Sequence, residues 1–262
     1  MAIILRNLGP TGLESGCETM ALAIPRKDLP IEPVTRTTVQ DHVYLKMKEL
    51  ILNGDIEPGR MVTIQSLSDA FGVSTMPVRE VLNRLVAEKA LTVVSGRSVG
   101  IPPLTIDRLD DLRRVRVEIE GVATEWAARG ISDADLDHLA GLIDRMDVAK
   151  TERDRATYVP ANREFHFTIY RAAGSETLMS IIESLWLQIG PYFDLLKATG
   201  NWWTANVEHG AMRDALMRRD GAGARKALEA DIEGAAAALK DILVEQRRTA
   251  EKPARRRRRM PE

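Results

Sequence analysis

The sequence has few of the features that mark exported or membrane-bound proteins. It holds a single cysteine among 262 residues, Cys17, so no disulfide framework can form and a reducing compartment is the simplest interpretation. Its apolar runs are too short to cross a bilayer. Its first residues, MAIILRNLGP, lack the charged start and cleavage site of a secretory signal. We therefore expect a cytoplasmic protein without a membrane partner.

Aromatic residues and net charge are scarce too. Phe, Trp and Tyr make up only 5% of the chain, so the core is expected to consist mostly of Leu, Ile, Val and Ala. The net charge is −1, which means that any binding of nucleic acid has to come from a local basic patch. A chain of this length allows one large domain or two of medium size.

Neither end of the chain has a sustained hydrophobic period. Residues 1–36 carry Gly, Pro and scattered charge, which predicts a flexible N-terminal arm. Residues 249–262 contain five consecutive arginines, Arg255 to Arg259, whose mutual repulsion predicts a disordered, solvated tail. A contact of this tail with nucleic acid is the alternative. Between the ends we predict two domains, residues 37–104 and residues 105–248.

The first domain has the pattern of three helices followed by a β-hairpin. An apolar face in VQDHVYLKMKELILNG predicts the first helix. Thr63 can cap a short second helix with an apolar stripe at Leu67, Ala70 and Phe71, and a third helix is expected to begin at Ser74. The stretch LTVVSGRSVGIPPL predicts the hairpin. This order of elements is the plan of a winged helix-turn-helix.

In that plan the third helix enters the major groove of DNA with its N-terminal residues against the bases. Here those residues are Ser74, Thr75, Met76 and Arg79. Arg79 could donate two hydrogen bonds to a guanine edge or bind a phosphate. Arg97, near the hairpin tip, is a further candidate for contact with the minor groove or the backbone. The alternative for both arginines is simple solvation at the surface.

The second domain is predicted to be helical throughout, with no convincing strand. Helical periodicity in its sequence is interrupted at Gly130, at Gly174 and at the Gly190–Pro191 pair. We expect six or seven helices in an antiparallel bundle. The fold class predicted for the whole chain is therefore mainly α, a winged helix-turn-helix joined to an all-helical bundle.

Two of the four histidines lie in a pattern typical of metal ligands. Asn162 and His166 are four residues apart, so they share one face of a helix and can reach one metal ion. His209 opens another helix, and Asp231 lies 22 residues after it in the last helix. The alternative is a hydrogen-bonded polar cluster without a metal, in which Asp231 accepts from His209.

The segment GVSTMPVREVLNRL resembles the recognition region of the GntR family of bacterial transcription regulators, whose usual pattern is V-S-R-T-P-V-R-E-A-L. The preceding ELILNGDIEPGRMV is similar to the helix, turn and Pro-Gly stretch of that family. The second domain resembles the all-helical FCD ligand-binding domain of the FadR-type subfamily. The resemblance covers about residues 38–246. It implies a homodimeric, ligand-responsive repressor that binds operator DNA and is not an enzyme.

The chain departs from the family pattern at two DNA-facing positions. Thr75 stands where the family usually has arginine, and Gln65 stands at a commonly basic position at the start of the preceding helix. Arg79 matches the family. The resemblance therefore implies an altered operator sequence and weaker phosphate binding, with DNA binding retained.

In FadR-type proteins an Asp or Asn and three histidines often surround a divalent cation in the bundle. Asn162, His166 and His209 match this set, and Asp231 stands where the last histidine usually is. Two imidazoles, an amide oxygen and a carboxylate suit zinc, nickel or manganese. The metabolite that such a domain binds is typically a small carboxylate, which a metal with open positions could hold.

Four more residues are candidates for binding this effector. Arg116 matches an arginine that the family has early in the domain, and it could bind an anion or form a structural salt bridge instead. Trp186, Tyr192 and Arg213 lie on predicted helices that could line the cavity, although core packing is the alternative for the aromatic residues. The competing function is a metal-dependent helical enzyme with an appended DNA-binding domain. Against it, Asn162 is a poor catalytic acid or base and no nucleophile is evident.

Overall fold

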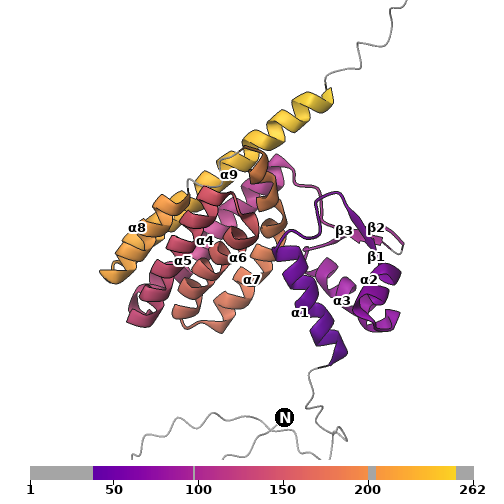
Figure 1. Cartoon of the computed structure of the whole chain (residues 1–262), viewed down its shortest axis with the longest axis horizontal. Coiled ribbons are helices and arrows are strands. Elements are labelled where there is room, and N and C mark those ends of the chain that lie inside the picture. Colours follow the sequence, from indigo (N-terminus) through magenta and orange to yellow (C-terminus); the bar gives the residue numbers. More distant parts are fainter. Residues whose placement is uncertain (1–37, 97, 200–204, 252–262) are drawn as a thin grey trace, which may run out of the picture. The chain divides into compact units, whose positions relative to one another are not determined.

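The first folded part consists of three helices and a small sheet (Figure 1). The computed structural model describes residues 38–96, 98–199 and 205–251. The helices are α1 (Val39–Leu52), α2 (Ile64–Phe71) and α3 (Thr75–Ala87), and the strands are β1 (Met61–Thr63), β2 (Thr92–Ser95) and β3 (Ser98–Gly100). This is the predicted winged helix-turn-helix.

Local sequence signals explain where these helices begin and end. Thr38 and Asp41 form a capping box at the start of α1, and Thr63 caps α2 through the backbone N–H of Ser66. Gly72 ends α2 with a left-handed backbone at φ 65°, a conformation that glycine adopts without steric cost. The short α2–α3 turn is therefore dictated by the residues that flank it.

Buried apolar residues join α1 to α3. Val43, Met47 and Ile51 of α1 are buried, and so are four apolar residues of α3, Val78, Val81, Leu82 and Leu85. These side chains belong to one core cluster. The recognition helix therefore rests directly on α1.

The stripe predicted for α2 is partly wrong. Leu67 is buried and Phe71 is half-buried, but Ala70 is exposed, and Ser68 is buried in its place. The Ser68 hydroxyl donates to the backbone oxygen of Ile64 at 2.8 Å, which satisfies a polar group that would otherwise make burial unfavourable.

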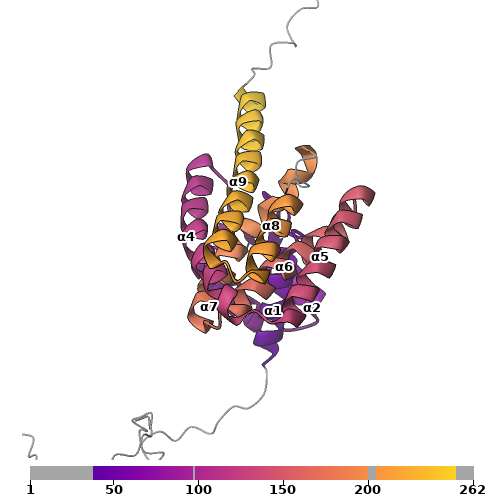
Figure 2. The same cartoon turned by 90° about the vertical axis from the view of Figure 1, so that its left-hand side faces the viewer.

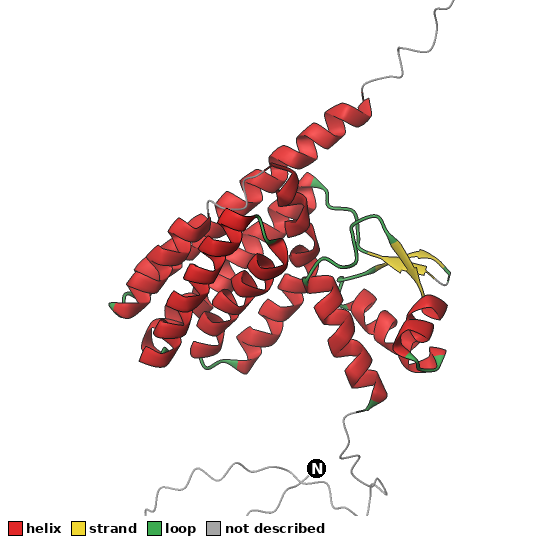
Figure 3. Cartoon of the chain, viewed as in Figure 1, coloured by secondary structure: helices red, strands yellow, loops and turns green. Residues whose placement is uncertain are grey.

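The sheet contains one strand more than the sequence pattern indicated. The hairpin of β2 and β3 is present as expected, and β1 pairs antiparallel with β3 to give the order β1–β3–β2. Within the described residues, all strands lie in this part of the chain (Figure 3). Three residues, MVT, are too few to show alternation between a buried and an exposed face, so β1 has no recognisable pattern.

The rest of the described chain is helical, as expected. Its elements are α4 (Ile106–Gly130), α5 (Asp133–Glu152), α6 (Arg155–Ala172), α7 (Glu176–Ile189), the 3₁₀ segment η1 (Gly190–Thr199), α8 (Ala205–Met217) and α9 (Gly221–Glu251). Helix α4 packs against α6, α7 and α9, and α8 packs against α5 and α9. Figure 2 shows α4, α9, α8 and α5 side by side. The mainly α fold class is confirmed.

The bundle core contains few aromatic side chains but concentrates them. Most of its buried residues are Leu, Ile, Ala and Met, and the buried aromatics include Tyr158, Phe165, Tyr170 and Trp186. Phe165, Tyr170 and Trp186 pack around His166, with ring centroids 5.5, 6.1 and 5.4 Å from its own. Helix α9 continues to Glu251, beyond residue 249 where the tail was predicted to begin. Among the described residues, no helix is both long enough and apolar enough to cross a membrane.

Candidate functional site

The N-terminal turn of α3 exposes a group of polar and flexible side chains. Ser74 precedes the helix with an extended backbone, Met76 is 61% exposed, Arg79 is exposed and Thr75 is half-buried. Within the part of the chain that the structure describes, no carboxylate pairs with Arg79. Its guanidinium is therefore available to a phosphate or a base edge.

Pro77 is the third residue of α3. The first four N–H groups of a helix have no partner within it, so a proline at this position removes no intrahelical hydrogen bond. Its fixed backbone angle suits a helix start.

The two departures from the family pattern lie close to this surface. Thr75 is the first residue of α3, and Gln65 is an exposed residue at the start of α2. The Gln65 side chain donates to Asp69 Oδ1 at 2.8 Å. Arg97, the wing-tip candidate, lies outside the described residues.

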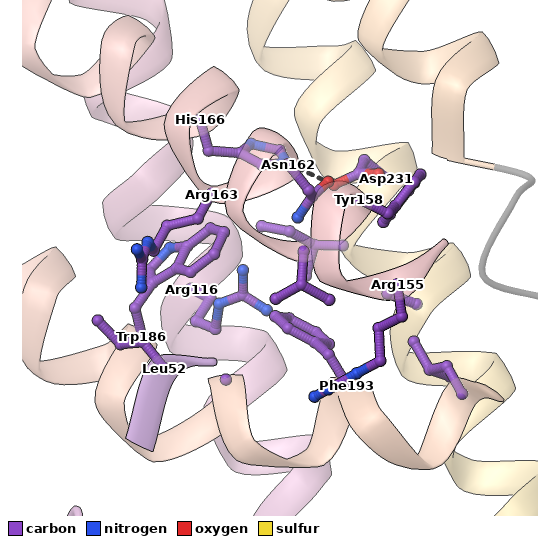
Figure 4. A pocket seen from close by; sticks show the side chains of 15 residues that line it. Leu52, Arg116, Arg155, Tyr158, Asn162, Arg163, His166, Trp186, Phe193 and Asp231 are labelled. Atoms are coloured by element: carbon purple, nitrogen blue, oxygen red, sulfur yellow. Dashed lines mark ion pairs between the residues drawn. The ribbon is translucent and has the colours of Figure 1, made fainter. Parts of the chain in front are cut away.

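A cavity opens inside the helical bundle between α4, α6, α7, η1 and α9 (Figure 4). Its space measures about 780 Å³, including the opening to solvent. The lining combines apolar side chains with convergent polar ones, as ligand sites do. The polar and aromatic lining residues are Arg116, Arg155, Tyr158, Asn162, Arg163, His166, Trp186, Phe193 and Asp231.

Three of the predicted metal ligands converge beside this cavity. The Nε2 atoms of His166 and His209 lie 3.2 Å apart. Asp231 Oδ2 lies 3.5 Å from His166 Nε2, and Asp231 Oδ1 lies 3.7 Å from His209 Nε2. Two ligands at about 2.0–2.1 Å from one tetrahedral zinc ion would be separated by about 3.3 Å, close to the spacing of these imidazoles.

The other ring nitrogen of each histidine contacts an oxygen atom. His209 Nδ1 lies 3.1 Å from Asn206 Oδ1, which can only accept. His166 Nδ1 lies 3.4 Å from the Tyr170 hydroxyl, which donates its own proton to Glu120 Oε2 at 2.6 Å. These contacts favour the tautomer with the hydrogen on Nδ1 for both rings, which would leave both Nε2 lone pairs facing one spot. Two facing lone pairs repel each other, and a shared cation removes that conflict.

Burial favours the protonation states that metal ligands need. It lowers the pKa of His209 to about 3 and that of His166 well below its ordinary value, so both imidazoles are neutral at pH 7. Burial also raises the pKa of Asp231 to about 7, with Arg116 opposing the shift. A cation would favour the ionised form of that carboxyl.

Asn162, the fourth predicted ligand, lies one helical turn before His166 on α6 and lines the same cavity (Figure 4). Helices α6, α8 and α9 thus bring together four residues that lie as much as 69 positions apart in the sequence, from Asn162 to Asp231. The donor set of two imidazoles, one carboxylate and one nearby amide fits a divalent cation.

Two family models match the chain and decide its family. Residues 39–101 match the gntR family of bacterial regulatory proteins, and residues 111–234 match the FCD domain. The chain belongs to the GntR family. Its helical bundle is an FCD domain.

Curated relatives agree with this assignment. The HTH-type transcriptional regulator McbR of Escherichia coli (strain K12) is 31% identical over 145 residues, which are 55% of this chain and 66% of McbR, just under two thirds. The regulator BphR of Paraburkholderia xenovorans is 27% identical over 76% of this chain and 84% of its own length. The E. coli repressor GlaR is 26% identical over 54% of this chain and 66% of GlaR.

A solved structure supports the fold. The structure of E. coli McbR/YncC matches with a TM-score of 0.73 and 26% identity, covering 79% of this chain and 99% of that chain. Both the winged part and the FCD domain of this chain are thus similar to known regulators of the GntR family.

A buried ion pair forms one wall of the FCD cavity. The Arg116 guanidinium donates twice to Glu120, from Nε at 2.6 Å and from Nη2 at 3.1 Å. Glu120 also accepts from the Tyr170 hydroxyl and, at 3.2 Å, from Trp186 Nε1. Arg116 and Trp186 therefore line the cavity as expected, but the charge of Arg116 is balanced by a carboxylate of its own helix.

The other two effector candidates lie elsewhere in the FCD domain. Tyr192 is buried, and its hydroxyl donates to the backbone oxygen of Pro102 in the segment that joins the two domains. Arg213 is half-buried on α8, where its Nε donates to Leu136 at 3.4 Å. Neither belongs to the described lining of the cavity, because both point toward neighbouring backbone.

Several cavity residues are not among those predicted from the sequence, above all Arg155, Tyr158 and Arg163. A signal for them exists. Asn162 follows Arg155 by seven residues and His166 follows Asn162 by four, so the three side chains share one face of a helix. Tyr158 and Arg163 lie next to that face. The polar face of α6 could therefore have been followed upstream from the metal ligands.

Proposed function

We propose that this chain is a DNA-binding transcription repressor whose affinity for operator DNA is changed by a small carboxylate bound in the FCD cavity. The observation that carries the proposal is that one chain holds both an exposed arginine on a recognition helix and a ligand-sized cavity with convergent polar groups, and that α1 contacts the recognition helix and the cavity. Leu52 of α1 lines the cavity, while α1 packs against α3.

The proposed DNA contacts are Arg79, Thr75, Met76, Ser74 and Gln65, with Arg97 on the wing. A homodimer would present two such helices to two half-sites, as helix-turn-helix dimers do. Repression is supported by the relative GlaR, which is named a repressor.

We also propose that a divalent cation is held by His166, His209 and Asp231, with Asn162 completing the set. Zinc, nickel and manganese all accept such donors. When bound, the ion would supply a Lewis-acidic position that takes an oxygen of the effector carboxylate. Tyr170 and Asn206 would keep the two imidazoles oriented, because each one fixes a ring nitrogen that faces away from the ion.

DNA binding is tested with fluorescently labelled DNA from the region upstream of the gene. The full chain is expected to bind it in preference to scrambled DNA, with an affinity that falls steeply as salt rises. Size-exclusion chromatography with light scattering should give the mass of a dimer. Equal affinity for both DNA molecules at every salt concentration would overturn the proposal.

Metal binding is tested by elemental analysis of the chain after dialysis against zinc, nickel or manganese. One ion per chain is expected for the wild type and none for His209→Ala. The matched control is His138→Ala, since His138 is an exposed histidine on α5 outside the cluster. Equal metal content in all three proteins would reject the site.

The enzyme alternative has less support. The described lining of the cavity includes no serine, threonine, cysteine or lysine to act as a nucleophile. The relatives are named as regulators. Turnover of a carboxylate ester or amide by the metal-loaded protein, lost in His209→Ala, would revive this alternative.

A further inference from the structure

Two arginines of the FCD domain hold the C-terminal end of α1. Arg155 Nη2 donates to the backbone oxygen of Asn53 at 2.6 Å, and Arg163 Nη1 donates to Asn53 Oδ1 at 3.2 Å. Asn53 is the residue that ends α1. The last turn of α1 contains no basic residue of its own. The positive charge that favours a helix C-terminus is therefore supplied by α6.

The same two arginines line the FCD cavity together with Leu52, the neighbour of Asn53 (Figure 4). Each guanidinium thus contacts the end of α1, and each arginine also lines the cavity. A ligand in the cavity and the end of α1 compete for the same donors.

Arg163 differs from Arg116 in how its charge is balanced. Arg116 is paired twice with Glu120. Within the described residues, no carboxylate forms an ion pair with Arg163, and its hydrogen bond goes to a neutral amide oxygen. Burial lowers the pKa of Arg163, and the charges of Glu49 and Glu164 oppose that shift without forming an ion pair with it. An anion is the partner that Arg163 lacks.

The cavity has a second place for an anion at the proposed metal cluster. In Figure 4 the His166–Asp231 pair and Leu52 lie at opposite ends of the view, with Arg116 between them. On α6, Arg163 precedes His166 by three residues and Arg155 precedes it by eleven, which are about 4.5 Å and about 16 Å along the helix axis at 1.5 Å per residue, so Arg163 is the arginine that a short diacid at the metal cluster could also reach. The cavity therefore offers positive charge at two separate positions.

We propose that the effector is a dianion, such as a dicarboxylate, with one carboxylate at the metal cluster and the other on Arg163, and that it binds by taking this guanidinium from Asn53. This inference rests on the proposed function. It adds the chemical class of the effector and the way in which effector binding changes the affinity for DNA. A charge-assisted, bidentate arginine–carboxylate pair is roughly twice as strong as a bond to a neutral acceptor, so the exchange is favourable.

Loss of this contact removes a hydrogen bond that attaches the C-terminal end of α1 to α6. Because α1 packs against the recognition helix through Met47 and Ile51, a change at its end alters the position of α3. Bound effector then lowers the affinity for operator DNA, and bound operator lowers the affinity for the effector by the same factor, typically about 5-fold to 150-fold.

Calorimetric titration of the full, zinc-loaded chain tests the ligand class. The probes are pairs of equal carbon number: succinate and butyrate, glutarate and pentanoate, adipate and hexanoate. In the wild type at least one diacid is expected to bind ten-fold or more tightly than its monoacid. Arg163→Gln should remove that difference. Arg145→Gln, which changes an exposed arginine of α5, is the control and should behave as the wild type.

Hydrogen exchange at the end of α1 tests the release. The N–H groups of Asn53, Gly54 and Asp55 donate to backbone oxygens of α1, at 2.9, 3.1 and 2.9 Å. The preferred diacid should speed their exchange in the wild type, and Asn53→Ala should raise diacid affinity because a competitor for Arg163 is gone.

The proposal is overturned if no diacid is preferred, if Arg163→Gln keeps the preference, or if the diacid slows exchange at residues 53–55. These results are independent of DNA. A protein that binds diacids through Arg163 but no operator would contradict the proposed function instead, and one that binds its operator but shows no diacid preference would contradict only this inference.

Discussion

The winged domain and the FCD domain place their functional side chains in opposite surroundings. In the winged domain the candidate DNA contacts, Ser74 to Arg79, are neighbours in sequence and reach the surface from one helix turn. In the FCD domain the candidate ligand contacts come from several helices, and His166, His209 and Arg116 are buried. An exposed group can be lost without effect on the fold, whereas a buried polar group depends on its partners.

This difference predicts how each domain responds to substitution. Removing an exposed DNA contact should change binding only, since water replaces the lost partner. Removing a member of the buried network should change stability, since the partners left behind cannot reach water.

The largest effect is expected for Glu120→Ala. It leaves the Arg116 charge buried without its partner and deprives the Tyr170 hydroxyl and Trp186 Nε1 of their acceptor. Breaking a buried ion pair from one side costs about 3–5 kcal/mol of unfolding free energy. Urea denaturation followed by circular dichroism measures it.

The control for Glu120→Ala is Glu118→Ala, two residues away on α4. Glu118 is 70% exposed and pairs with Arg225 at the surface, a kind of pair worth about 0–1 kcal/mol. Similar losses for both variants would mean that burial does not distinguish the two positions.

The next effect concerns cation removal. A cation that binds only the folded chain stabilises it by about 2.7 kcal/mol at a free concentration 100 times its Kd. Chelation should therefore lower the unfolding midpoint of the wild type and leave that of His209→Ala unchanged. A wild type that is equally stable with and without zinc would contradict the proposed ion, and the facing Nε2 atoms would then need another explanation.

Sequence reasoning predicted the winged domain well because its signals are local. Thr63 and Gly72 mark the two ends of α2 through their own chemistry, and the buried positions of α3 follow from its period. The strand β1 was missed because its pairing with β3 is a long-range contact that three residues cannot encode.

The FCD site was predicted only in part for the same physical reason. His166, His209 and Asp231 could be found through a family pattern, but periodicity does not show which faces of separate helices meet. For Tyr192 and Arg213, membership of a nearby helix predicts a place in the cavity lining, but their side chains turn to backbone oxygens elsewhere. The role of Arg163 depends on Asn53, which is 110 residues away.

Within the winged domain, Arg79→Ala should weaken specific operator binding by about 1–3 kcal/mol, the usual loss for an arginine that contacts a base. Fluorescence anisotropy with operator and scrambled DNA measures this. The stability and zinc content of the variant should match those of the wild type, because Arg79 is exposed and far from the cavity in sequence. The control is Arg145→Ala on α5. An unchanged operator affinity for Arg79→Ala would show that another side chain supplies the main contact.

The smallest effect, and the one that bears most directly on operator choice, is expected for Thr75→Arg. Position 75 is the first residue of α3 and is only half-buried, so a longer side chain can extend toward DNA without displacing the core. One added phosphate contact should steepen the dependence of log affinity on log salt by about 1. If the new arginine instead contacts a base, the salt slope stays constant and the preferred operator sequence shifts. An unchanged slope together with an unchanged preference would mean that position 75 does not face DNA, and the divergence of this chain from its family would then have to be sought at Gln65.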